Sequence, residues 1–420
     1  GPGSCTELFF LFFFLRNFFF ALFYLRHLRS KYEKIKDVVV LVCRFAVLNF
    51  FPVPVEEECL SEDKRRRGIC MNTYECRIQQ GKSHGPCALG FGVCCIFTTS
   101  CGGEVQNNLT YVTSPGFPNL VDQPMNCSVV VKRIEPQVSQ LRIDFVHFNI
   151  GQPNRRTGLC DEDVMEVKSG ENSIQLCGWN SGQHGECIYM DIAESGSIIE
   201  FQLPSDLQSR MWEMRVIQLP FEQRAPAGCL QFFDAPRGNL KTLNYLPNGR
   251  YLANQDYLLC VRQERGMCSI SYSPCSNDSF RIGPSRFVAN DDNAMGPSMS
   301  SPANGDVAEG SGTVDPSTSV PSNPTMNPRC PDRVLIPCDF EEFITPGNDG
   351  AGVCDLEHCG DSLCGPNEIE ADGNCRVETS ATPFHIRVAF GSGEDGAGTT
   401  GSAEDKAGMC LTYEQLPCVL

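Results

Sequence analysis

Cysteine is the residue type in this sequence with the most obvious chemistry, at 25 copies in 420 residues. Cysteines in such numbers form disulfides in an oxidising compartment or bind metal in a reducing one. Cys94 and Cys95 are adjacent, which is too close for ordinary zinc-ligand spacing, and the chain has only 6 histidines. The sequence therefore predicts a disulfide-bonded, secreted protein of the extracellular space.

The first dense group of cysteines spans Cys59 to Cys95 and has few large apolar residues between its members. A segment this small cannot bury enough apolar surface to stay folded alone, so disulfides must hold it together. We expect a cysteine-rich module at residues 48–100, with its bridge connectivity left open. Its predicted disulfide residues are Cys59, Cys70, Cys76, Cys87, Cys94 and Cys95.

Residues that could catalyse a reaction lack the neighbours that catalysis requires. Ser195 lies in AESGSII without the Gly-x-Ser-x-Gly pattern of a nucleophile elbow, and this segment is typical of a turn before a strand. His147 belongs to an alternating strand pattern, and His184 and His358 lie in cysteine-rich loops. No phosphate-binding glycine loop and no His-Glu-x-x-His motif occurs. We predict no catalytic residue and no enzyme activity.

The net charge of −17 argues against polyanionic partners. We expect no nucleic-acid binding, and membrane association only if the apolar segment at the amino terminus is retained. Three Asn-x-Ser/Thr sequons agree with passage through the secretory pathway. The predicted glycosylation sites are Asn108, Asn126 and Asn277.

The amino-terminal residues 1–47 are set apart by their composition. Residues 8–25 are almost entirely aromatic and aliphatic, with Arg16 and Asn17 near the centre, and a basic run and a second apolar run follow. This order is typical of a signal peptide, and the alternatives are a signal anchor and sequence that does not belong to the mature protein. Setting aside Cys5 and Cys43 leaves an odd number of cysteines. One cysteine is therefore unpaired, bonded to another chain, or paired within the excluded segment.

The remaining sequence reads as short strands separated by turns. Residues 140–150 alternate in period two up to Phe145 and resume at Phe148, which predicts a strand with a one-residue bulge. Three further strands are predicted at 163–170, 195–203 and 211–219, with no helix between them. Strands at this spacing favour an antiparallel sandwich.

A second group of strands is predicted on both sides of a polar stretch. Residues 228–275 and 330–418 contain strand patterns, whereas 290–328 have six prolines, four glycines and seven serines and no aromatic residue. A stretch of this composition cannot offset the entropy of folding and is predicted to be disordered. Each flanking part holds few strands, and together they are enough for one sandwich.

Several motifs now resemble one family. CGGEVQNNLTYVTSPGFPN from Cys101, then Cys127, IDFVHFNI, CDEDVMEV and FQLPSD are similar to the CUB domain, an extracellular antiparallel β-sandwich. The resemblance implies a bridge from Cys101 to Cys127. It covers residues 101–220, and GCLQFF, LANQDYLLCVRQERGMCSISYSPC and LTYEQLPC extend it to a second CUB-like domain at 228–420 with an insertion at 290–328. The full arrangement resembles arthropod secreted proteins. The other cysteines expected in disulfides are Cys160, Cys177, Cys229 and Cys260.

Many CUB domains bind calcium, and the resemblance locates the ligand positions. The position of the family's glutamate falls at Gly151, and that of its tyrosine near Val121. Asp163 matches, while Asp206 is displaced by an apparent insertion. Calcium needs six or more oxygen ligands, so these losses weaken the site. We expect no cofactor, with Asp163 and Asp206 as the candidate calcium residues; Asp163 has the alternative role of a buried structural acceptor.

The expected fold class is all-β, with two antiparallel CUB-like sandwiches preceded by a small disulfide-rich module. The resemblance implies a secreted, non-catalytic protein that recognises an extracellular protein or glycan. Two alternatives stay open. The amino-terminal module is similar to the clip modules of arthropod protease cascades, which suggests a regulator or cofactor of such a cascade, and the polar stretch suggests a structural matrix component.

Overall fold

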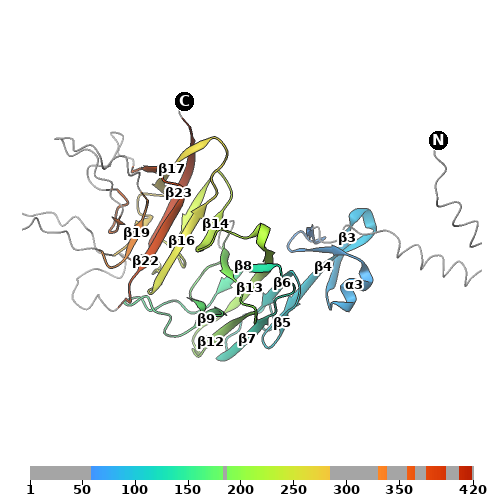
Figure 1. Cartoon of the computed structure of the whole chain (residues 1–420). Helices are drawn as coiled ribbons and strands as arrows, with labels where there is room; N and C mark the ends of the chain where they lie inside the picture. Colours follow the sequence, from blue (N-terminus) through green and yellow to red (C-terminus); the bar gives the residue numbers. More distant parts are fainter. Residues whose placement is uncertain are drawn as a thin grey trace, which may run out of the picture. The chain divides into compact units, whose positions relative to one another are not determined.

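The computed structural model describes residues 58–182, 187–283, 330–337, 357–364, 375–393 and 406–418 (Figure 1). The predictions for residues 1–47, His184 and the polar stretch 290–328 lie outside these ranges. Within them, no helix is long and apolar enough to cross a membrane. The chain divides into two compact units, Gly1–Ile96 and Phe97–Leu420.

The first unit is a small sheet with one short helix. Strand β1 (Glu58–Leu60) pairs with β2 (Arg67–Met71), and both β2 and β3 (Lys82–Cys87) pair antiparallel with the first part of β4 (Gly92–Thr99). Helix α3 (Thr73–Ile78) begins where the Asn72 side chain accepts the Tyr74 N–H, a standard N-cap. Three disulfides cross the described part of this unit: Cys59–Cys94, Cys70–Cys87 and Cys76–Cys95.

The second unit contains two sandwiches, and the first of them follows Phe97. One of its sheets runs from the end of β4 through β6, β13 and β8 to β11, and the other has the order β10-β9-β12-β7-β5. The strands are β5 (Glu104–Val105), β6 (Leu109–Thr113), β7 (Met125–Val131), β8 (Val138–Asn149), β9 (Val164–Ser169), β10 (Asn172–Leu176), β11 (Cys187–Asp191), β12 (Ser197–Leu203) and β13 (Met211–Pro220).

The predicted bulge in β8 is present. His147 pairs with Glu213 and Phe145 pairs with Met214, so Val146 is the extra residue. The bulge lets Phe145 and Phe148 both face the core, where their rings meet edge to face at 5.1 Å. The two sheets meet where the buried Trp212 ring of β13 stacks on the Phe201 ring of β12 at 4.3 Å.

The second sandwich joins strands from both sides of the undescribed residues 284–329. Strand β16 pairs with β22, and β23 pairs with both β15 and β17. Its sheets have the orders β14-β16-β22-β19-β20 and β15-β23-β17-β21, with β18 also on β23. The strands are β14 (Cys229–Phe233), β15 (Arg237–Lys241), β16 (Gln255–Val261), β17 (Met267–Pro274), β18 (Phe280–Arg281), β19 (Arg333–Leu335), β20 (Glu357–His358), β21 (Val377–Thr379), β22 (His385–Phe390) and β23 (Gly408–Pro417).

The prediction of an all-β fold with two sandwiches is confirmed. One detail differs, because three pairs of the described strands are parallel rather than antiparallel: β4 with β6, β5 with β7 and β14 with β16. In each parallel pair, the earlier strand is the first strand that its part of the chain adds to that sheet. The two strands of the pair are not joined by a tight hairpin, which would require them to be antiparallel.

Disulfides also cross the second unit. The described pairs are Cys101–Cys127, Cys160–Cys177, Cys229–Cys260, Cys268–Cys418, Cys275–Cys410, Cys330–Cys359 and Cys364–Cys375. Among the described cysteines, Cys187 is free and buried. The unpaired cysteine among the described residues therefore lies on strand β11.

Candidate functional site

Asp163 lies in the core of the first sandwich as half of an ion pair. Its carboxylate accepts hydrogen bonds from Arg210 Nε at 2.6 Å and Nη2 at 2.8 Å, and both side chains are fully buried. The remaining guanidinium hydrogens go to the carbonyl oxygens of Gln123, Gln208 and Ser205. A bidentate arginine therefore balances the charge that a calcium ion would otherwise balance.

The neighbourhood of Asp163 also explains the glycine at the position of the family's glutamate. The Gly151 N–H donates to Asp163 Oδ2 at 2.9 Å, and a Cβ on Gly151 would lie 3.0 Å from that oxygen. Asp206 is exposed, whereas both members of this pair are buried. No cluster of three metal-ligating side chains occurs in the described part of the chain. The geometry matches the buried structural acceptor, and the residues present do not fit a calcium ion.

Asp332 of the second sandwich has an equivalent arrangement. Gly391, which follows β22, donates its N–H to Asp332 Oδ1 at 2.8 Å, as Gly151 after β8 does to Asp163. Here a tyrosine replaces the arginine, since Tyr251 Oη donates to Asp332 Oδ2 at 2.6 Å. Burial is the main cause that raises the pKa of Tyr251 far above its ordinary value, so Tyr251 stays a donor at physiological pH. Both aspartates thus accept the backbone N–H of a glycine that follows a strand, together with a hydrogen bond from a buried side chain.

The candidate catalytic residues are not brought together. Ser195 is exposed in a turn, and His147 on β8 has its Nε2 3.9 Å from a Glu213 carboxylate oxygen. His358 is buried with Nδ1 2.8 Å from the Leu363 carbonyl oxygen. Cys187 lies beside Arg142 on β8, and desolvation raises the pKa of its thiol to about 11. A thiol with this pKa is protonated at neutral pH, which makes it a poor nucleophile.

The predicted glycosylation sites differ in accessibility. Asn126 on β7 and Asn277 are exposed, whereas Asn108 is half-buried just before β6. The middle residue of the Asn126 sequon, Cys127, is held in a disulfide. A bulky glycan can be accommodated without moving the chain at Asn126 and Asn277.

The two sandwiches meet at a joint centred on Asn244, which sequence patterns did not reveal. Its Oδ1 accepts the Trp179 N–H at 2.8 Å, its own N–H donates to Asn180 Oδ1 at 2.7 Å, and its Nδ2 is 3.3 Å from Gln152 Oε1. Asn244 is buried and has φ +59°, a conformation that asparagine tolerates better than most residues. A second link is the Ala253 N–H, which donates to the Gly158 carbonyl oxygen at 2.9 Å.

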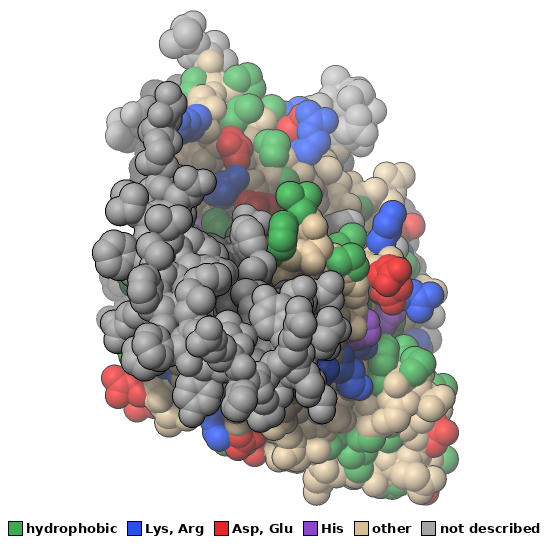
Figure 2. Space-filling model, turned by 90° about the vertical axis from the view of Figure 1, so that its right-hand side faces the viewer, with side chains coloured by type: hydrophobic (Ala, Val, Ile, Leu, Met, Phe, Trp, Pro, Cys, Tyr) green, Lys and Arg blue, Asp and Glu red, His purple; other side chains and the backbone are tan. Residues whose placement is uncertain are grey.

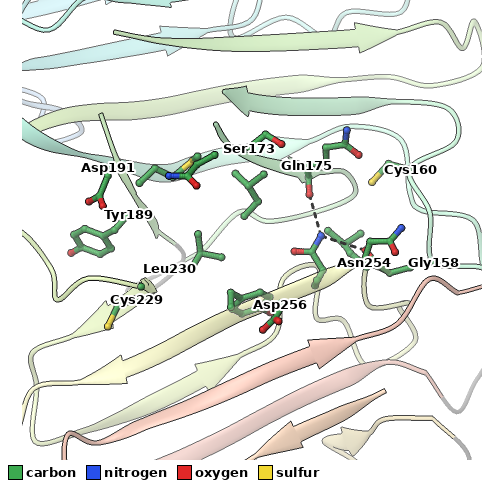
Figure 3. Close-up of a pocket in the computed structure, with 18 of the residues that line it drawn as sticks. Gly158, Cys160, Ser173, Gln175, Tyr189, Asp191, Cys229, Leu230, Asn254 and Asp256 are labelled. Atoms are coloured by element: carbon green, nitrogen blue, oxygen red, sulfur yellow. Dashed lines mark hydrogen bonds between the residues drawn. The ribbon is translucent and has the colours of Figure 1, made fainter. Parts of the chain in front are cut away.

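A groove opens beside this joint, with a volume of about 430 Å³. Figure 3 shows Ser173, Gln175, Tyr189 and Asp191 on the side of the first sandwich, opposite Cys229, Leu230 and Asp256 of the second. Its volume falls in the range of ordinary ligand sites. Because both sandwiches line the groove, its shape depends on the joint.

Two carboxylates are the charged side chains among the described lining residues of the groove. Asp256 on β16 accepts two hydrogen bonds from Arg387, at 2.7 and 2.6 Å, and this partner lowers the pKa of Asp256. Asp191 on β11 accepts from Gln140 Nε2 at 3.3 Å. Lysine and arginine are absent from this described lining, but Arg224 Nη2 lies 4.0 Å from Asp191 Oδ1, so each of the two carboxylates has an arginine beside it. The face of the molecule in Figure 2 likewise shows acidic and basic side chains interspersed.

Family models match most of the second unit. The model for the CUB domain matches residues 101–215, and that for the animal CUB domain matches 226–416. Dog cubilin is 27% identical over 176 residues, which is 40% of this chain and 4% of cubilin. Rat neuropilin-2 is 26% identical over 145 residues, 34% of this chain and 15% of that protein. The chain thus spans only a small part of the length of these relatives.

Solved structures that contain CUB domains are also similar. The CUB1-EGF-CUB2 fragment of rat MASP-1 is 12% identical and covers 76% of this chain and 99% of its own, with a TM-score of 0.24. The calcium-bound CUB2 domain of MASP-1 is 18% identical and covers 28% of this chain and 98% of its own, also at 0.24. CUB domains and many disulfides are typical of extracellular proteins. Each of the two sandwiches thus matches a family model of the CUB domain.

Proposed function

We propose that this protein is a secreted, non-catalytic recognition protein, and that it binds an extracellular protein ligand in the groove between its CUB domains. The observation that carries the proposal is the groove itself, of about 430 Å³ and lined by both sandwiches. Loops and edges held by a rigid scaffold are where binding residues concentrate. The joint at Asn244 supplies that rigidity.

The composition of the groove supports binding over catalysis. Its lining combines amide side chains such as Asn172 and Gln255 with apolar ones such as Leu230 and Ile174. Ligand sites are mostly concave and apolar, with a few polar groups that fix orientation. The lining holds no histidine, and its cysteines, Cys160 and Cys229, are in disulfides. A Ser-His or Cys-His pair is therefore missing from the described groove residues.

Site-specific photo-cross-linking tests this proposal. The full chain would carry a photo-reactive amino acid at Asn172, which is exposed and lines the groove, and in a matched protein at Asn239, which is exposed on β15 outside it. We expect one extracellular protein to be cross-linked from position 172 and not from 239. Identical products from both positions, or none from 172, would contradict a ligand in the groove. A protease as the recurrent product would favour the cascade regulator.

A further inference from the structure

Strand β10 forms one wall of the groove and is an edge strand. It pairs with β9 on one side and lies at the end of its sheet. Asn172 to Gln175 all line the groove. An edge strand presents a row of backbone donors and acceptors that can pair with another extended chain.

The hairpin between β9 and β10 shows which backbone groups are available. Ser169 pairs with Asn172 across the two-residue loop Gly170–Glu171, so this closing pair is hydrogen-bonded. Bonded and unbonded pairs alternate along an antiparallel ladder. Asn172 therefore bonds to β9, whereas the backbone groups of Ser173 and Gln175 point to the opposite side.

A side-chain contact supports this direction. On the other wall of the groove, Nε2 of Gln255 on β16 donates a hydrogen bond to the Gln175 carbonyl oxygen at 3.4 Å (Figure 3). The Gln175 carbonyl thus faces the groove, and the Ser173 groups, two residues away, face it too. Outside the ladder with β9, no described residue bonds to the Ser173 backbone or to the Gln175 N–H.

We propose that the groove binds an extended peptide segment of a protein partner, which pairs as an added strand on the outer edge of β10. Main-chain bonds to Ser173 and Gln175 would give affinity, as in other cases of strand addition. The Gln255 amide occupies one of the acceptors in the free protein and is displaced on binding. This inference rests on the proposed function and names its ligand class.

The probe is a phage-displayed library of linear heptapeptides, panned on the immobilised full chain. We expect linear peptides to be enriched, because main-chain pairing with an edge strand needs only an extended chain. A synthetic peptide from this set should slow amide hydrogen exchange of Ser173 and Gln175. Methylating its backbone nitrogens one at a time should lower affinity at every second position, because alternate residues of an added strand face away from β10.

One pair of variants of the full chain isolates the main-chain contact. Ser173→Pro removes an outward N–H without removing a bond to β9, and Ser173→Ala keeps that N–H. We expect Ser173→Pro to bind at least about tenfold more weakly than Ser173→Ala, roughly 1.4 kcal/mol.

Several results would overturn the added strand. These are no enrichment of any peptide, equal affinity of the two Ser173 variants, or nitrogen methylation without a two-residue period. If a protein is cross-linked from Asn172 while these peptide experiments fail, the groove is a binding site but β10 does not pair with the ligand. If position 172 also captures nothing, the proposed function fails with it.

Discussion

The Asp163–Arg210 pair shows how single residues decide what a CUB scaffold can bind. Both side chains are fully buried, and Arg210 donates to four acceptor residues, including Asp163. Such a pair is costly to desolvate but more costly to break, because a single charge would remain buried. The Arg210 guanidinium therefore occupies the place that a bound cation would take beside Asp163.

Replacing Arg210 should consequently be severe. We expect Arg210→Met to lower the free energy of unfolding by about 3–5 kcal/mol, since Asp163 would be left buried without its partner. Urea unfolding monitored by the fluorescence of the buried Trp212 measures the loss. The matched control is Arg237→Ala, which breaks the exposed pair with Glu414 and should cost below about 1 kcal/mol. Similar losses in the two variants would refute the role of burial.

Cys187 provides a pH-dependent prediction at the same scale. Burial raises its thiol pKa from 9.0 to about 11, so the folded state retains a proton that the unfolded state loses. Its contribution to stability is full below about pH 9 and is lost as the pH rises toward about 11.

Iodoacetamide labelling followed by peptide mass spectrometry checks this. We expect Cys187 to remain unlabelled in the folded protein at neutral pH, to react as the pH approaches about 11, and to react readily in denaturant at pH 9. Rapid labelling of the folded protein at pH 7, or recovery of Cys187 in a disulfide, would contradict the prediction.

The bulge in β8 is the clearest case of an element fixed by one residue. Val146 has no partner on β13, and it shifts the alternation so that Phe145 and Phe148 both reach the core. Side chains alternate with period two, so a one-residue slip moves every later side chain to the other face.

Deleting Val146 should remove the bulge and leave a regular ladder, because Phe145 opposite Met214 would then be followed directly by His147 opposite Glu213. Phe145 and Phe148 stay on the core face after the deletion, so we expect the protein to fold and to lose at most about 3 kcal/mol of stability. Val146→Ala keeps the bulge and should cost at most about 1.5 kcal/mol. Circular dichroism and denaturant titration of both proteins compare them, and a deletion variant that fails to fold would show that the bulge itself is required.

Sequence patterns could predict the long strands but not the edge strand of the groove. Residues 211–219 were predicted as a strand and form β13 at Met211–Pro220, because a strand with one face in a core must alternate. The sequence of β10, Asn-Ser-Ile-Gln-Leu, has mostly exposed side chains and carries little such signal. An edge strand leaves most of its side chains exposed, so its sequence resembles that of a loop.

At the scale of the whole molecule, the groove depends on contacts between sandwiches that no local pattern encodes. Asn244 lies in a polar loop of the sequence, and its partners Gln152, Trp179 and Asn180 are far away in the chain. A positive φ at asparagine hints at a turn, but a turn does not disclose its partners. The two domains could therefore be predicted from the sequence, but the groove that they share could not.

The last prediction concerns this joint. Asn244→Ala leaves the Trp179 N–H without its acceptor and places alanine at φ +59°, so we expect the joint to weaken by about 2–4 kcal/mol. The Ala253 N–H, which bonds across the joint to Gly158, should then exchange with deuterium about 30-fold to 1,000-fold faster, while Ile199 in the core of the first sandwich should keep its rate. Asn244→Gly is the matched control, because glycine also lacks the amide but tolerates the positive φ. If only the alanine variant loosens Ala253, backbone strain is the cause; if both do, the amide hydrogen bonds hold the two CUB domains together and with them the groove.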